Sequence, residues 1–178
     1  GPFSYPGDYF SAEAPEKYKI KGSFGHPVPV VDGKTQSSGA KASAIVLKKE
    51  FTDVKDLLCI DYTSAYSTPS LDKLVRTFVY DRQGKGSFTV GDEFTANAPI
   101  RFETAITTQA NWKIIDDTHL LLTTGTEQMT VTIEASGKVA FTSETIEVNS
   151  PAYTRIGISL KEQSKDGYIR LTMRTKQL

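Results

Sequence analysis

The feature that most constrains the fold is an alternation of apolar and polar residues with a period of two. Val131 and Ile133 alternate with threonine and glutamate, and Ile156 and Ile158 recur in the same way with polar or small neighbours. The stretch 168–174, YIRLTMR, repeats the pattern. Successive side chains of a strand point to opposite faces, so this alternation predicts half-buried strands.

Turn sequences separate these segments at short intervals. They are VDGK at 31–34, DRQGKG at 81–86, EASGK at 134–138 and SKDGY at 164–168. A dozen or so strands, roughly the number indicated, are too many for one open sheet without splitting. The sequence therefore predicts an all-β fold, an antiparallel two-sheet β-sandwich of about a dozen strands with little or no helix. One helical turn after Pro69, giving way to strand by Val75, is the exception that we expect.

The domain organisation predicted is simple. A chain of 178 residues is long enough to bury one core. Residues 1–17 form an irregular lead-in whose first two residues, Gly1 and Pro2, resemble the scar of a cleaved tag, and 18–178 form the sandwich. The aromatic residues of the lead-in are expected to dock on this domain or on a neighbouring one.

Charge and apolar patterning exclude several classes of partner. The 21 basic and 21 acidic residues cancel and neither sign forms a long run, so neither a nucleic acid nor a membrane surface is a predicted partner. No apolar stretch approaches the ~20 residues that span a bilayer. The one cysteine, Cys59, lies in an apolar segment and is expected to be buried.

His26 is one of two histidines and lies in GSFGHPVPVVDGKTQ, residues 22–36. Pro27 favours an extended backbone before it, so the imidazole is expected to project from a loop or strand end. From the residues alone, a hydrogen-bonded structural histidine is favoured over a group that neutralises a carboxylate or acts as acid or base. The other histidine, His119, follows a predicted turn at Asp116 and Asp117.

No other short motif indicates catalysis. The sequence contains no GxSxG, Gly-rich phosphate loop, HExxH or paired CxxC. A zinc site assembled across strands from His26 with Asp61 or Glu103 has no support from spacing. Asp92, on the predicted strand face of Val90 and Phe94, is interpreted as a strand-end or turn acid that accepts backbone hydrogen bonds.

Aromatic residues offer a second kind of candidate, since a flat ring with polar neighbours can stack on a sugar. The candidates are Tyr62, Tyr66, Tyr80 and Trp112. Most aromatic residues of a sandwich belong to its core, however, and this alternative stays open for each of them.

Three stretches together resemble the β-sandwich region of the heparinase II/III-like polysaccharide lyases, including their alginate-lyase relatives. They are GHPVPVVDGKTQ at 25–36, ASAIVLKKEFTDVKDLLCIDYTSAY at 42–66 and LVRTFVYDRQGKGSFTVGDEF at 74–94. The resemblance implies a preceding α-helical toroid domain, absent here, and an acidic polysaccharide bound in the cleft between toroid and sandwich. It also implies a periplasmic or secreted protein.

The activity implied by the resemblance is β-elimination next to a uronic acid. The catalytic tyrosine and histidine come largely from the toroid, so we expect this chain alone to be inactive. His26 matches the cleft-facing histidine of the family, and Pro27 stands where many relatives carry serine or asparagine. We name Tyr66, Arg82 and Trp112 as further substrate-binding candidates.

No cofactor is predicted. Some relatives hold a structural zinc through two histidines and an aspartate, and His26 and His119 are the only histidines here. The competing functional hypothesis is a carbohydrate-binding or purely structural sandwich module.

Overall fold

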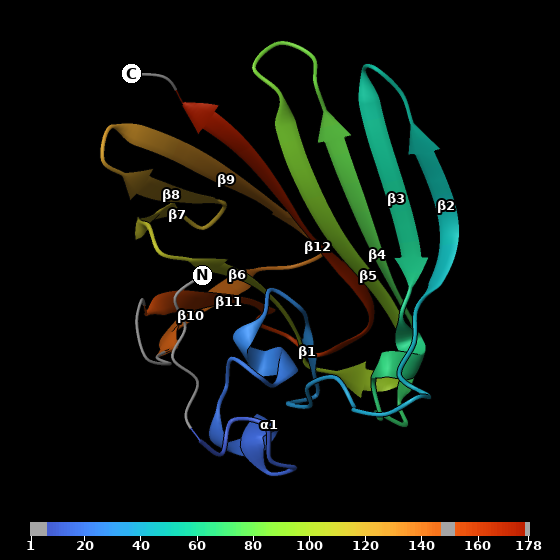
Figure 1. The fold of residues 1–178 in the computed structure, drawn as a ribbon. Helices are drawn as coiled ribbons and strands as arrows, with labels where there is room; N and C mark the ends of the chain where they lie inside the picture. The colour runs from blue at the N-terminus through green and yellow to red at the C-terminus, as the bar shows by residue number, and fades with distance from the viewer. Residues whose placement is uncertain (1–6, 147–151, 177–178) are drawn as a thin grey trace.

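The computed structural model describes residues 7–146 and 152–176, which form two antiparallel sheets packed face to face (Figure 1). The eight-stranded sheet contains, in spatial order, β2 (Ile45–Phe51), β3 (Lys55–Asp61), β4 (Leu71–Asp81), β5 (Ser87–Ile100), β12 (Ser164–Lys176), β9 (Glu127–Ala135), β8 (His119–Thr124) and β7 (Asn111–Asp116). The four-stranded sheet contains β1 (Val30–Val31), β6 (Phe102–Thr108), β11 (Tyr153–Leu160) and β10 (Val139–Ile146). The predicted all-β sandwich is confirmed.

Among the residues that the structure describes, helix occurs only in short pieces. They are α1 (Ala14–Lys17) and the 3₁₀ turns η1 (Ser23–Gly25) and η2 (Thr63–Ala65). Within the two described ranges no helix is long and apolar enough to cross a membrane. The boundary predicted at residue 17 stays a prediction, and Gly1 and Pro2 lie outside the described residues.

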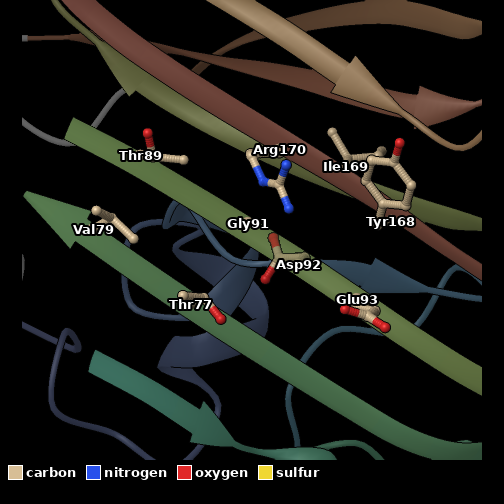
Figure 2. Close-up of a pocket in the computed structure, with 9 residues that line it drawn as sticks. All are labelled: Thr77, Val79, Thr89, Gly91, Asp92, Glu93, Tyr168, Ile169 and Arg170. Atoms are coloured by element: carbon tan, nitrogen blue, oxygen red, sulfur yellow. The ribbon is translucent and has the colours of Figure 1, made fainter. Parts of the chain in front are cut away.

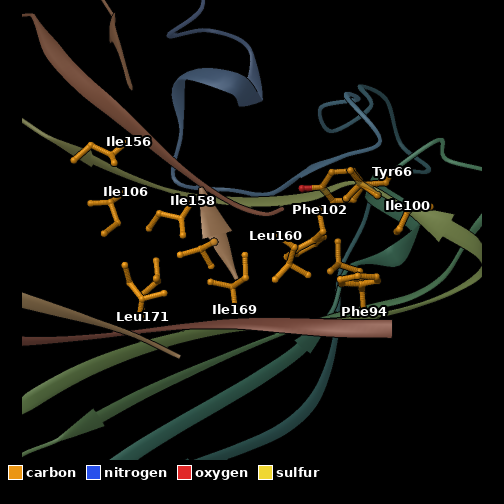
Figure 3. Close-up of a cluster of buried hydrophobic side chains, with 14 of the residues drawn as sticks. Tyr66, Phe94, Ile100, Phe102, Ile106, Ile156, Ile158, Leu160, Ile169 and Leu171 are labelled. Carbon is orange, nitrogen blue, oxygen red and sulfur yellow. The ribbon is translucent and has the colours of Figure 1, made fainter. Parts of the chain in front are cut away.

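The core lies between the inner faces of the two sheets, where the predicted alternation places its apolar side chains (Figure 3). Phe94 of β5 stacks on Phe102 of β6 with ring centroids 4.6 Å apart, which joins the large sheet to the small one. Ile169 and Ile158 are fully buried beside them. Complete burial of one such side chain contributes about 1.5–3 kcal/mol, so this layer supplies most of the stability.

Strand β11 is buried on both faces, which the alternation alone did not predict. Arg155, expected on the polar face, is only 3% exposed and lies under the N-terminal segment, with its guanidinium carbon 4.4 Å from the centre of the Phe24 ring. Its Nη1 donates to Glu103 Oε1 at 2.7 Å. The N-terminal segment therefore packs on the outer face of the small sheet and hides charged groups that a free sheet would expose (Figure 1).

Asp92 is the main correction to the sequence-based interpretation. It lies in the middle of β5, is 1% exposed, and forms a bidentate ion pair with Arg76 of β4, with Nε–Oδ1 and Nη2–Oδ2 distances of 2.7 and 2.8 Å. The hydroxyls of Tyr62 and Thr104 donate to the same carboxylate, each at 2.7 Å. Because Thr104 belongs to β6, this network connects the two sheets.

Two smaller expectations are also wrong. A hydrogen-bonded turn, Leu71 N–H to the Thr68 carbonyl at 3.0 Å, replaces the helical turn after Pro69, and β4 begins at once at Leu71. Pairing with β5 along nearly the whole strand outweighs the local capping signal. Cys59 is half-buried on the outer face of β3, where Thr77 Oγ1 lies 3.6 Å from its Sγ.

The substitution Asp92→Asn keeps the shape of the side chain but leaves the buried Arg76 charge without its counterion. We expect it to lower the free energy of unfolding by about 3–5 kcal/mol, measured by urea denaturation. Glu93→Gln, one residue on and exposed, is the matched control and is expected to stay within about 0.5 kcal/mol. Equal midpoints for the two variants would contradict this role of Asp92.

Candidate functional site

The segment that carries His26 is held by its backbone carbonyls. The hydroxyl of Tyr153 donates to the Gly25 carbonyl at 2.7 Å, Nη1 of Arg76 to the Pro27 carbonyl at 2.7 Å, and the hydroxyl of Tyr66 to the Pro29 carbonyl at 2.8 Å. The three carbonyls alternate along the chain, and their donors come from both sides of the sandwich. The segment is therefore fixed as an extended strap.

Gly25 begins this strap at a position that only glycine can occupy. A Cβ there would overlap the carbonyl of Lys19, whose oxygen accepts the Gly25 N–H at 2.9 Å. The 3₁₀ turn η1 ends at Gly25, and His26 continues with φ −111° and ψ 161°. This is the extended backbone that Pro27 predicts for the residue before it.

The side chain of His26 is exposed and makes no hydrogen bond or ion pair with any residue in 7–146 or 152–176. No hydrogen bond among the described residues therefore supports a structural role for the imidazole. An anchored backbone that presents an exposed imidazole with no partner among the described residues is an arrangement that suits ligand binding.

A hollow of about 330 Å³ lies beside His26, between the strap and the end of β6. Its polar lining consists of His26, Thr107, Thr108, Gln109 and Tyr153. Burial raises the pKa of Tyr153, and its proton is already donated to Gly25. The hollow can therefore hold a polar ligand through hydroxyl, amide and imidazole groups, whereas Tyr153 has a positioning role.

The other predicted binding residues do not line this hollow. Tyr66 is 6% exposed and belongs to the core, where burial raises the pKa of its hydroxyl. Arg82 follows β4 at the hairpin tip, 2.5 Å from Asp56 Oδ2 and over the ring of Tyr80. Trp112 is half-buried on β7 at the edge of the large sheet, against the core. A direct substrate contact by any of the three stays a prediction.

No zinc site comes together from the candidates named above. Glu103 accepts from Arg155, Asp61 accepts from Thr63, and His119 Nδ1 lies 2.9 Å from Asp116 Oδ1 in the edge hairpin. Across the described ranges, no three His, Cys, Asp or Glu side chains are grouped as metal ligands.

Sequence reasoning missed the residues that build the strap. Tyr153 and Arg76 lie 128 and 49 positions from the carbonyls that they bind, and a spacing of that length carries no periodic signal. The sequence clue closest to them is the alternation of Gly25, Pro27 and Pro29, because proline nitrogens have no hydrogen to donate and leave only carbonyls to be satisfied.

Removal of one anchor should loosen the strap. Tyr66→Phe leaves the buried Pro29 carbonyl without its donor, and we expect a loss of about 1–3 kcal/mol in the free energy of unfolding, measured by urea denaturation. Tyr80→Phe, a tyrosine that is 45% exposed, is the control and should be neutral. If both variants unfold at the same urea concentration, the hydrogen bond to Pro29 is not an anchor.

This chain is similar to known proteins in its structure, whereas comparisons of its sequence find no match. No family model matches the chain. No curated protein matches it either.

Solved structures of heparinase III and of a heparan sulfate lyase share the fold. Heparan sulfate lyase HepC from Pedobacter heparinus superposes with a TM-score of 0.75 at 14% identity, over 100% of this chain and 28% of that one. A heparinase III, the BT4657 gene product, gives 0.73 at 13% identity, over 98% of this chain and 28% of that one. Another heparinase III structure gives 0.66 at 16% identity, with 86% and 24% covered.

The chain thus spans about a quarter of the length of the structures that it matches. At these identities the likeness concerns the fold. The resemblance inferred from the sequence is confirmed at that level: this chain has the β-sandwich fold that forms part of heparinase III and of heparan sulfate lyase HepC.

Proposed function

We propose that the chain is the C-terminal sandwich domain of a polysaccharide lyase that cleaves a uronic-acid-containing polysaccharide by β-elimination. In this proposal the strap and the hollow beside it form one wall of the substrate cleft. The observation that carries it is the exposed His26, whose ring has no partner among residues 7–146 and 152–176, on a backbone anchored at three carbonyls. The fold shared with a heparan sulfate lyase supports the choice of reaction class.

The chemistry assigns His26 a definite task. A base removes the proton from C5 of the uronate, the C4–O bond breaks, a double bond forms between C4 and C5, and the leaving oxygen takes up a proton. The carboxylate next to C5 must be neutralised or hydrogen-bonded, because negative charge develops there as the proton leaves. An imidazole titrates near neutral pH and can donate to that carboxylate.

The remaining groups of the site act on binding. Thr107, Thr108 and Gln109 line the hollow, and their side chains carry hydroxyl and amide groups. Such groups hold sugar hydroxyls without taking part in proton transfer. The base and the general acid belong, in this proposal, to an α-helical toroid that precedes the sandwich in the parent protein, and a periplasmic or secreted location goes with such a substrate.

His26→Ala in the full-length parent is expected to lower kcat/KM by about 10²-fold or more, because a group that acts on the developing charge is lost. The assay follows the ultraviolet absorbance of the new double bond on alginate and glycosaminoglycan substrates. The thermal midpoint should be unchanged, since His26 is exposed and its ring makes no hydrogen bond to the described residues.

His119→Ala is the matched control. His119 is the other histidine, and it contacts Asp116 in the edge hairpin, away from the strap. Its loss should leave turnover unchanged. A His26 variant that melts earlier but keeps normal activity per folded molecule would contradict the proposal, and so would turnover by the 178-residue chain alone.

A further inference from the structure

Gly91 lies inside the central strand β5 without any structural requirement for glycine. Within the described residues two other glycines lie inside strands, Gly157 and Gly167, and both are forced by packing. A Cβ at Gly157 would lie 2.5 Å from Thr142 Oγ1, and one at Gly167 would lie 2.8 Å from Ser136 Oγ. A Cβ at Gly91 would meet nothing closer than 3.7 Å, an ordinary contact with the Arg170 side chain.

Backbone geometry does not explain Gly91 either. It does not have the positive φ that favours glycine. Its pairing with Thr77 on β4 and with Arg170 on β12 runs in unbroken register. The register shifts of β5 lie elsewhere, where it faces residues 71–73 and 164–166. Glycine weakens a strand interior, and where neither a bulge nor close packing requires it, it marks a place that a ligand can approach.

The space above Gly91 is a hollow of about 280 Å³ on the outer face of the large sheet (Figure 2). Cross-strand register builds its walls. Thr77 and Arg170 lie on either side of Gly91, and Glu93 lies opposite Tyr168 in the next outward-facing row. Figure 2 shows Arg170 and Tyr168 on one side of the hollow and Glu93 and Thr77 on the other.

These walls have the chemistry of a saccharide site. Tyr168 is 39% exposed, and the guanidinium carbon of Arg170 lies 5.8 Å from the centre of its ring. Flat aromatic faces stack on the apolar face of a pyranose. Thr77, Glu93 and Arg170 add hydroxyl, carboxylate and guanidinium groups that can bind ring hydroxyls.

Charge determines which saccharide fits. Arg170 is paired with Glu134 at 3.0 Å, so its charge is already balanced. Glu93 has no ion-pair partner within 7–146 and 152–176. Glu93 therefore leaves the hollow with an unbalanced negative charge, which disfavours a uronate or a sulfated sugar relative to an uncharged one.

We propose that the hollow over Gly91 is a binding site for a neutral pyranose unit of a glycan, stacked on Tyr168 and hydrogen-bonded by Glu93, Thr77 and Arg170. The site is separate from the hollow beside His26. Arg76, which anchors the strap, points to the inner face of β4, whereas Thr77, the next residue, points to the outer face. The proposal does not depend on the lyase function.

The test titrates the chain with neutral hexasaccharides, namely cellohexaose, mannohexaose and xylohexaose, and with a mannuronate hexasaccharide. Calorimetry gives the affinity, and amide chemical shifts locate the site. We expect a neutral hexasaccharide to bind in the micromolar to millimolar range and to shift the amides of Gly91, Tyr168 and Arg170. The mannuronate should bind more weakly.

Gly91→Val is the decisive variant because it fills the hollow while suiting a strand. We expect a thermal midpoint equal to or above that of the unchanged chain, with at least a roughly tenfold loss of affinity. Gly137→Val is the control: Gly137 lies in an exposed turn where a Cβ meets nothing within 4 Å, and affinity should be retained. Tyr168→Ala, on an exposed side chain, should also lose about tenfold and tests the site should Gly91→Val fail to fold.

Several outcomes would overturn the proposal. One is that none of the neutral hexasaccharides binds at millimolar concentration. Others are that binding survives in both Gly91→Val and Tyr168→Ala, that the mannuronate binds more tightly than the neutral sugars, or that the shifted amides surround His26. None of these outcomes contradicts the function proposed for His26, so the two proposals can fail independently.

Discussion

The ion pair between Arg76 and Asp92 is the interaction on which the rest of the structure depends. It places two opposite charges between the sheets, and the buried nitrogens and oxygens of both side chains form hydrogen bonds. Tyr62, directly after β3, and Thr104 of β6 donate to the carboxylate, and the last guanidinium nitrogen donates to the Pro27 carbonyl. Although burial disfavours its charge, the carboxylate of Asp92 raises the pKa of Arg76, which therefore stays charged.

A buried ion pair is weak evidence for stability, because desolvation offsets most of its attraction. Its consequence here is that it positions the strap that carries His26. An apolar pair could fill the same volume, but it would offer no donor to the strap that carries His26. The candidate site is thus an extension of the core: the same guanidinium that pairs with Asp92 fixes the backbone of an exposed histidine at the surface.

Both proposed binding sites are connected to strand β4. Alternation along β4 sends Arg76 inward to the strap and Thr77 outward to the hollow over Gly91. The hollow beside His26 has an imidazole and no carboxylate among the groups that line it, whereas the hollow over Gly91 has Glu93 and a balanced Arg170. In the two proposals, an acidic sugar binds beside His26 and a neutral sugar binds over Gly91, which would let one small domain hold chemically different parts of a glycan.

Local pattern was sufficient for the fold class and for the conformation at His26. Strand alternation, turn residues and the restriction that Pro27 imposes all act over a few residues, so they can be recognised in a sequence. Asp92 shows where this fails: the residues around it are compatible with a strand-end acid, and nothing local indicates that Arg76, 16 positions earlier, lies beside it. Tyr66 likewise looks like a free aromatic until its hydroxyl is seen on Pro29.

By itself, then, the sequence determined the strands, the turns, the two-layer architecture and the extended backbone at His26. Only the tertiary structure decided that Tyr66, Arg76 and Tyr153 meet that strap, and that Gly91 lies under open space while Gly157 and Gly167 do not. The physical reason is distance along the chain. Periodicity reports which way a side chain points, whereas the partner that it meets depends on the register and packing of strands up to 128 positions away.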